Sequence, residues 1–134
     1  TVYQRYHAPV KSLTPKQIQE LCTVDYDRHL AISGFVRDGD VERMVAVGRY
    51  ILDPATNLAE VAFTVHDDLQ GRGVGTWLLD RLIRIARSRG VAGLVGYVLS
   101  NNVRMLIMFH RAGVPVTSTL EGGIYTVTLR FETS

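Results

Sequence analysis

Two hydrophobic periods alternate along the chain, one of two residues and one of three to four. The first is typical of strands and the second of helices. In residues 58–65, for example, Val61, Phe63 and Val65 share one face, and the residues between them share the other. The pattern predicts strands over residues 2–6, 30–36, 45–52, 58–65, 94–99, 116–120 and 124–131, the last two joined as a hairpin about Glu121-Gly122-Gly123.

Helical segments are predicted at three places. The first begins at the capping sequence Thr14-Pro15-Lys16-Gln17 and runs to about Cys22. The second follows a glycine-rich turn and runs to about Arg89, with an apolar stripe of Val74, Leu78, Leu79, Leu82, Ile83, Ile85 and Ala86. The third runs from Asn102 to about Ala112. Strands followed by a strand–helix–strand–helix unit and a hairpin predict an α/β domain with a mixed sheet and helices on its faces.

The composition agrees with one ordinary domain. The 134 residues are 46% hydrophobic and 21% charged, close to the globular average. No apolar run approaches the roughly 20 residues of a membrane span, so we expect a soluble protein with no membrane partner. The lone Cys22 and the lack of zinc-type spacing predict a reducing, cytoplasmic location and no metal. A net charge of +2 gives little reason to expect nucleic acid as a partner. Because the chain opens with Thr1, we expect a domain excised from a longer protein.

The turn Gln70-Gly71-Arg72-Gly73-Val74-Gly75 is the most distinctive local feature. Glycines at alternate positions between a strand and a helix leave backbone N–H groups free to bind an anion such as a pyrophosphate. Arg72 can add a charge-assisted contact. The spacing fits neither a dinucleotide fingerprint, since Thr76 stands where the third glycine belongs, nor a P-loop. An ordinary strand-to-helix corner is the alternative interpretation.

Two motifs give the chain a family resemblance. Phe63-Thr64-Val65 with Gln70-x-x-Gly73-x-Gly75 resembles the acetyl-CoA signature of the GNAT N-acetyltransferases. Asn102-x-x-Met105-x-x-x-Phe109-x-x-x-Gly113 is similar to the segment that follows in that family. The resemblance implies a GNAT fold, a mixed and mostly antiparallel sheet with a central acetyl-CoA-binding unit, in one domain over residues 1–134.

A narrower resemblance concerns the acceptor. Four segments are similar to the acetyltransferase domain of bacterial protein lysine acetyltransferases: Asp25-Tyr26-Asp27-Arg28, Val47-Gly48-Arg49-Tyr50, the segment from Ala59 to Phe63 and the segment from Asp67 to Gly73. That likeness implies a protein partner, such as an acyl-CoA synthetase with an acceptor lysine, and a fused regulatory domain. The alternatives are a small-amine acetyltransferase and a non-catalytic acetyl-CoA sensor.

The resemblance also implies which residues hold acetyl-CoA. Backbone N–H groups of Gln70, Gly71, Arg72, Gly73, Val74 and Gly75 would bind the pyrophosphate. Backbone groups of Phe63, Thr64 and Val65 would bind the pantetheine arm, while the side chains of Phe63 and Val65 are expected in the core. Asn102 either hydrogen-bonds that arm or caps its helix.

Glu60 is the candidate catalytic residue. A lysine with a pKa of about 10.4 costs roughly 4–5 kcal/mol to deprotonate at pH 7, so the reaction needs a base. Glu60 lies on the strand that leads to the glycine turn, on the face opposite Val61. In the similar lysine acetyltransferases a glutamate at this strand position is the general base. The alternative is a solvent-facing carboxylate paired with Arg49.

Phe109 departs from the family pattern, because many relatives have a tyrosine there that protonates the leaving thiolate. A thiol pKa of about 8.5 makes the thiolate a tolerable leaving group without an acid. Tyr97 could take the role, although its strand position favours packing. The general acid therefore stays unassigned.

Overall fold

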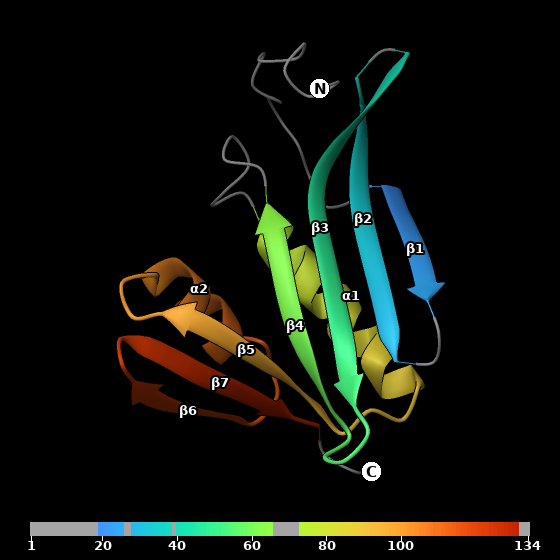
Figure 1. Cartoon of the computed structure of the whole chain (residues 1–134). Coiled ribbons are helices and arrows are strands. Elements are labelled where there is room, and N and C mark those ends of the chain that lie inside the picture. Colours follow the sequence, from blue (N-terminus) through green and yellow to red (C-terminus); the bar gives the residue numbers. More distant parts are fainter. Residues whose placement is uncertain (1–18, 26–27, 39, 66–72, 132–134) are drawn as a thin grey trace.

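The computed structural model describes residues 19–25, 28–38, 40–65 and 73–131. These residues form one sheet and two helices (Figure 1). The elements in chain order are β1 (Gln19–Asp25), β2 (His29–Asp38), β3 (Val41–Asp53), β4 (Leu58–Val65), α1 (Val74–Ser88), β5 (Gly93–Leu99), α2 (Val103–His110), β6 (Val116–Glu121) and β7 (Ile124–Arg130).

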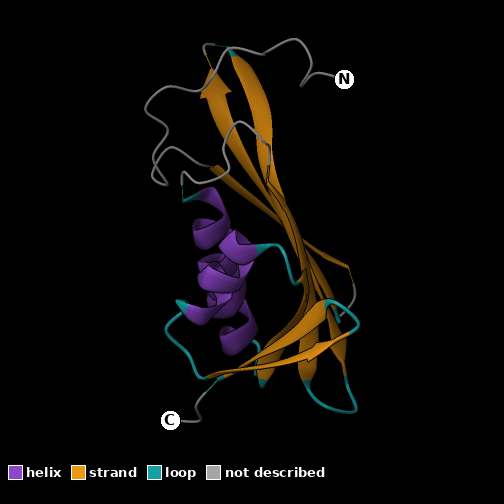
Figure 2. Ribbon diagram, turned by 90° about the vertical axis from the view of Figure 1, so that its left-hand side faces the viewer, coloured by secondary structure: helices purple, strands orange, loops and turns teal. Residues whose placement is uncertain are grey.

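The sheet has the strand order β1-β2-β3-β4-β5-β7-β6. Neighbouring strands are antiparallel except for β4 and β5, which are parallel and are connected through α1. Both helices cover the same face of the sheet (Figure 2). The prediction of a mixed, mostly antiparallel sheet with a central strand–helix–strand–helix unit is confirmed. We call the other face, which neither described helix covers, the open face.

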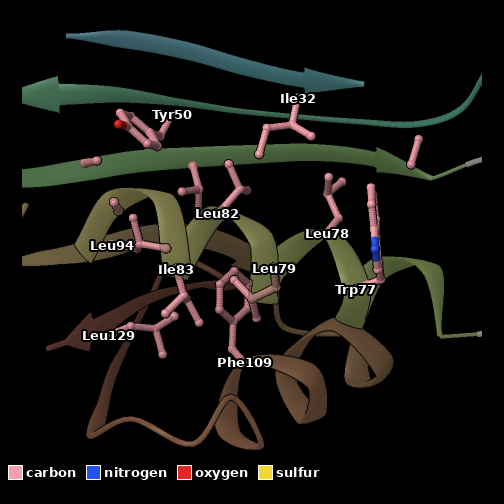
Figure 3. Packing of buried hydrophobic residues seen from close by; sticks show 14 of the residues in the cluster. Ile32, Tyr50, Trp77, Leu78, Leu79, Leu82, Ile83, Leu94, Phe109 and Leu129 are labelled. Atoms are coloured by element: carbon pink, nitrogen blue, oxygen red, sulfur yellow. The ribbon is translucent and has the colours of Figure 1, made fainter. Parts of the chain in front are cut away.

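The core lies between α1 and the strands that it crosses, β2 to β5. The predicted stripe of α1 is buried, with Ile85 only partly so, and Trp77 joins it. Leu78 points at the sheet (Figure 3). It approaches β3 so closely that a Cβ at Gly48 would lie 2.9 Å from Leu78 Cγ. Glycine at this position therefore lets the helix pack directly on the strand.

The second helix is anchored through one aromatic ring. Phe109 of α2 is 2% exposed and lies against β5, where a Cβ at Gly96 would meet the ring at 2.7 Å. Its ring also stacks on that of Phe63 in β4. These contacts hold α2 beside α1 on the helix-bearing face (Figure 2).

The predicted helix up to Cys22 is wrong over the residues that the structure describes. Gln19–Asp25 is strand β1, paired antiparallel with β2 from Gln19↔Phe35 to Asp25↔His29. Backbone pairing along a whole strand outweighed the local helix signal, as tertiary context often does. The capping sequence at residues 14–17 and the strand expected over residues 2–6 lie outside the described residues.

The start of β3 also differs from the prediction. The strand begins at Val41 instead of residue 45, and it pairs with β2 through a register shift at Gly34/Phe35. The polar residues Glu42 and Arg43 interrupt the apolar alternation that sequence analysis relies on. Arg43 is nevertheless buried, at 1% exposure.

Candidate functional site

The strands β4 and β5 separate partway along their length. They pair only from Leu58↔Gly93 to Glu60↔Val95, although β4 continues to Val65 and β5 to Leu99 (Figure 1). On its other edge β4 stays paired with β3 up to Val65. Within the described residues, the edge of β4 over residues 61–65 that faces β5 therefore has no ladder partner. Such an edge can bind an extended ligand through its backbone groups.

Glu60 is the last residue of β4 that pairs with β5. Ala59 and Val61 on either side are buried beneath α1, so the exposed Glu60 lies on the open face. Its direct cross-strand neighbours are Ile51 on β3 and Val95 on β5. The carboxylate thus stands on the open face at the point where the two strands part.

Arg49 lies diagonally across from Glu60, since it pairs with Ala62 two residues further along β4. Diagonal neighbours are about 7–8 Å apart, within reach of long side chains. Even so, no ion pair joins Glu60 and Arg49 in the part of the chain that the structure describes. The interpretation of Glu60 as one half of such a pair is therefore not supported.

Gly73 is the N-cap of α1 and has a left-handed backbone, with φ 84° and ψ 2°. Among the described residues no side chain caps this end, and the first turn of α1 holds no acidic residue. Val74 is buried and Gly75 is half-buried in that turn. Uncapped N–H groups at the positive end of the helix dipole suit an anion. Gln70, Gly71 and Arg72 lie outside the described residues.

A groove of about 500 Å³ runs between α1 and the end of α2, beginning at Gly73. Thr76 and Trp77 line it from α1, and Met108 and Arg111 line it from α2. The exposed Arg111 adds a cation to this groove. The sequence gives no signal for Arg111, because no local motif marks a residue that lines a groove formed by two helices.

The three candidate residues of β4 lie beyond the point of strand separation. The side chain of Phe63 is half-buried and packs against the core, as predicted. Thr64 is exposed, and Val65 ends the strand. Their backbone belongs to the edge that faces β5 without pairing with it.

Asn102 is the N-cap of α2, and its Oδ1 accepts a hydrogen bond from the backbone N–H of Met105 at 3.2 Å. The capping role that the sequence allowed is thus confirmed. The side chain is exposed and lines a hollow of about 620 Å³ together with Asn101, Val103, Arg104 and Ile107. The cap does not use the amide nitrogen Nδ2, so this nitrogen is available as a hydrogen-bond donor.

Phe109 occupies the position of the family's acid and Tyr97 was considered in its place; their side chains lie on opposite faces of β5. Phe109 is buried against Gly96 on the helix-bearing face. Tyr97 is 58% exposed on the open face, two residues beyond the partner of Glu60. The expectation that Tyr97 is a packing residue is wrong, because most of its side chain is exposed and neither of the described helices covers this face.

Two further observations concern metal ligands and membrane-spanning helices among the described residues. Within them, no group of three or more His, Cys, Asp or Glu side chains could hold a metal ion. Neither α1 nor α2 is long and apolar enough to cross a membrane.

Comparison with known sequences gives one family match and several relatives. Residues 3–114 match the profile of the Acetyltransferase (GNAT) family. An acetyltransferase named Pat from Mycolicibacterium smegmatis is 34% identical over 114 residues, which cover 84% of this chain and 33% of that protein. The chain spans about a third to a half of the length of the curated relatives it matches.

Solved structures with the same architecture include two at about 30% sequence identity. The GNAT domain of S. lividans PAT superimposes with a TM-score of 0.67 at 29% identity, covering 81% of this chain and 64% of that one. A cAMP-binding acyltransferase from Mycobacterium smegmatis gives a TM-score of 0.65 at 31% identity, covering 81% of this chain and 33% of that one.

Proposed function

We propose that this chain, which belongs to the GNAT family of N-acetyltransferases, transfers an acetyl group from acetyl-CoA to a lysine side chain of a protein. The family uses acetyl-CoA as its donor. The observation that carries the proposal is the position of Glu60, an exposed carboxylate at the point where β4 and β5 part. Donor and acceptor can meet there from opposite faces of the sheet.

The donor lies on the helix-bearing side in this proposal. Its pyrophosphate binds the N–H groups at the start of α1, where Gly73, Val74 and Gly75 follow Gln70, Gly71 and Arg72. The uncapped, acid-free first turn supports this assignment. Arg111 in the adjoining groove supplies a cation for the nucleotide end.

The pantetheine arm then runs along the free edge of β4. Backbone groups of Phe63, Thr64 and Val65 bind its amides as a neighbouring strand would. Nδ2 of Asn102 donates to the arm while Oδ1 keeps its cap on α2. The thioester then reaches the level of Glu60.

The acceptor approaches from the open face. Glu60 takes a proton from the lysine ammonium, directly or through one water, and the free amine attacks the thioester carbon. A new C–N bond forms, the C–S bond breaks, and the electron pair leaves with sulfur as the CoA thiolate. The nitrogen then loses a second proton, which passes to the thiolate or to water and leaves the neutral amide. Because a thiolate is a moderate leaving group, the reaction tolerates phenylalanine at position 109.

The acceptor class follows from the resemblance to protein lysine acetyltransferases, whose substrates include acyl-CoA synthetases. A fused regulatory domain belongs to the same expectation. The structural neighbours support the acetyltransferase fold, and the acceptor is inferred from the motifs around Asp25, Arg49 and Glu60.

The test is an incubation of the protein with acetyl-CoA and an AMP-forming acyl-CoA synthetase, read by intact mass and peptide mapping. Spermidine and free amino acids serve as small-amine acceptors in parallel. We expect acetylation of one lysine of the synthetase and little thiol release with small amines. Thiol release with small amines alone would contradict the proposed acceptor class, and binding of acetyl-CoA without any transfer would favour a sensor.

A further inference from the structure

Three large apolar side chains gather on the open face at the end of β5. Tyr97 is 58% exposed, Leu99 is 61% exposed, and Ile124 on β7 is 42% exposed. Leu99 and Ile124 are direct cross-strand partners. Tyr97 lies two residues before Leu99 and therefore on the same face of β5. We call these three residues the apolar strip.

The strip begins beside Glu60 and leads away from it. Val95, the partner of Glu60, lies on the same face of β5 as Tyr97 and Leu99. At about 3.3 Å per residue, Tyr97 is about 7 Å and Leu99 about 13 Å beyond Val95. The separation of the strands leaves this stretch of β5 without a partner on the β4 side in the described part of the chain.

We infer that the apolar strip binds the residues next to the acceptor lysine, and that the acceptor is an extended polypeptide segment with large apolar side chains two and four positions from that lysine. This inference rests on the proposed function. It adds a sequence preference, which the resemblance does not supply.

The repeat of an extended chain fits the strip. Alternate side chains of such a segment point the same way and are about 7 Å apart. With the lysine at Glu60, the side chain two positions away meets Tyr97, and the one four positions away meets Leu99 and Ile124. A small amine bound at Glu60 is too short to reach Leu99. Only a longer acceptor therefore gains binding free energy by burying the Leu99 side chain.

The charges around the strip fit the same occupant. Glu60 stands at one end, and Glu121, the partner of Ile124, stands at the other. The three strip residues between them are neutral. A neutral, apolar stretch that follows a lysine complements this arrangement, whereas an acidic segment or an anionic surface meets a carboxylate at either end.

Three lysine peptides with blocked ends serve as probes. One carries leucine two and four positions before its single lysine, one carries leucine at the same positions after it, and one carries serine at all four positions. Acetyl transfer to each is measured by mass spectrometry. We expect one leucine peptide to have a kcat/KM at least fivefold above the serine peptide.

The double variant Leu99→Thr/Ile124→Thr keeps only the Tyr97 contact, so it should lower that preference at least twofold and leave the rate on the serine peptide within twofold. The matched control is Leu120→Thr, an equally exposed residue that pairs with the partly buried Tyr125 and so lies on the helix-bearing face. It should keep the preference. Equal rates on all three peptides, or a preference that is undiminished in the double variant, overturn the inference and leave lysine acetylation standing. Loss of the serine-peptide rate in the double variant also overturns the inference. So does a dimer that buries the apolar strip and acetylates all three peptides at equal rates. Failure to acetylate any peptide or protein lysine, with small amines still used, instead contradicts the proposed function.

Discussion

The ring of Phe109 stacks on the ring of Phe63, with centroids 5.8 Å apart and an angle of 27° between the planes. The pair connects α2 to β4 beyond the point where β4 leaves β5. Cζ of Phe109 is also the ring atom that a Cβ at Gly96 would meet first. A hydroxyl on that carbon would point into the backbone of β5, so the site has no room for the tyrosine of the family pattern.

The variant Phe109→Tyr should therefore be less stable without being a better enzyme. Overpacking a buried ring typically lowers the free energy of unfolding by about 1–3 kcal/mol. Urea denaturation measures this loss, and Tyr97→Phe, which removes an exposed hydroxyl, should change stability by no more than about 0.5 kcal/mol. A stable Phe109→Tyr protein with raised kcat would show that the hydroxyl fits and acts as an acid.

Gly73 and Gly113 offer a matched pair for testing the phosphate site. Both have left-handed backbones, with φ of 84° and 81°, and in both a Cβ would meet no described atom within 4 Å. Alanine at either position should therefore cost a similar backbone strain of roughly 1–2 kcal/mol. Only Gly73→Ala should weaken acetyl-CoA binding, by about tenfold, because only Gly73 begins α1. Calorimetric titration measures the affinity, and equal Kd values for the two variants would argue against a pyrophosphate at this turn.

The two roles of Asn102 can be separated by substitution. Asn102→Ala removes the cap on α2 and should lower stability by about 1 kcal/mol. Asn102→Asp keeps an oxygen for the cap but loses the Nδ2 donor, so it should retain stability and bind acetyl-CoA several-fold more weakly. Thermal unfolding with and without acetyl-CoA reports both quantities. An Asp variant with unchanged affinity would leave Asn102 as a cap alone.

The sequence predicted those features that depend on local periods and turn residues. The start of α1 at Gly73 and its end before Gly90, both with positive φ, follow from glycine's access to that conformation. The faces of β4 and the cap at Asn102 follow from alternation and from side-chain chemistry. Each of these signals involves residues only a few positions apart.

What the sequence did not predict depends on contacts between distant segments. The hydrophobic alternation of β5 is the same whether the strand pairs with β4 over its full length or only up to Val95. The local sequence therefore does not reveal that the two strands separate at Glu60. Amphipathic helices do not specify which face of a sheet they cover. Tyr97 was expected to pack against its neighbours and lies instead exposed on the open face.

The most direct test of the account compares the wild-type protein with Glu60→Gln in initial-rate assays of thiol release and in acetyl-CoA titrations. The control is Glu42→Gln, an exposed glutamate on β3 that pairs with Arg37. If Glu60 is the base, Glu60→Gln should lower kcat by about 10²-fold or more while acetyl-CoA affinity stays within twofold, and Glu42→Gln should change neither. A Glu60→Gln protein that keeps its full kcat would contradict the account.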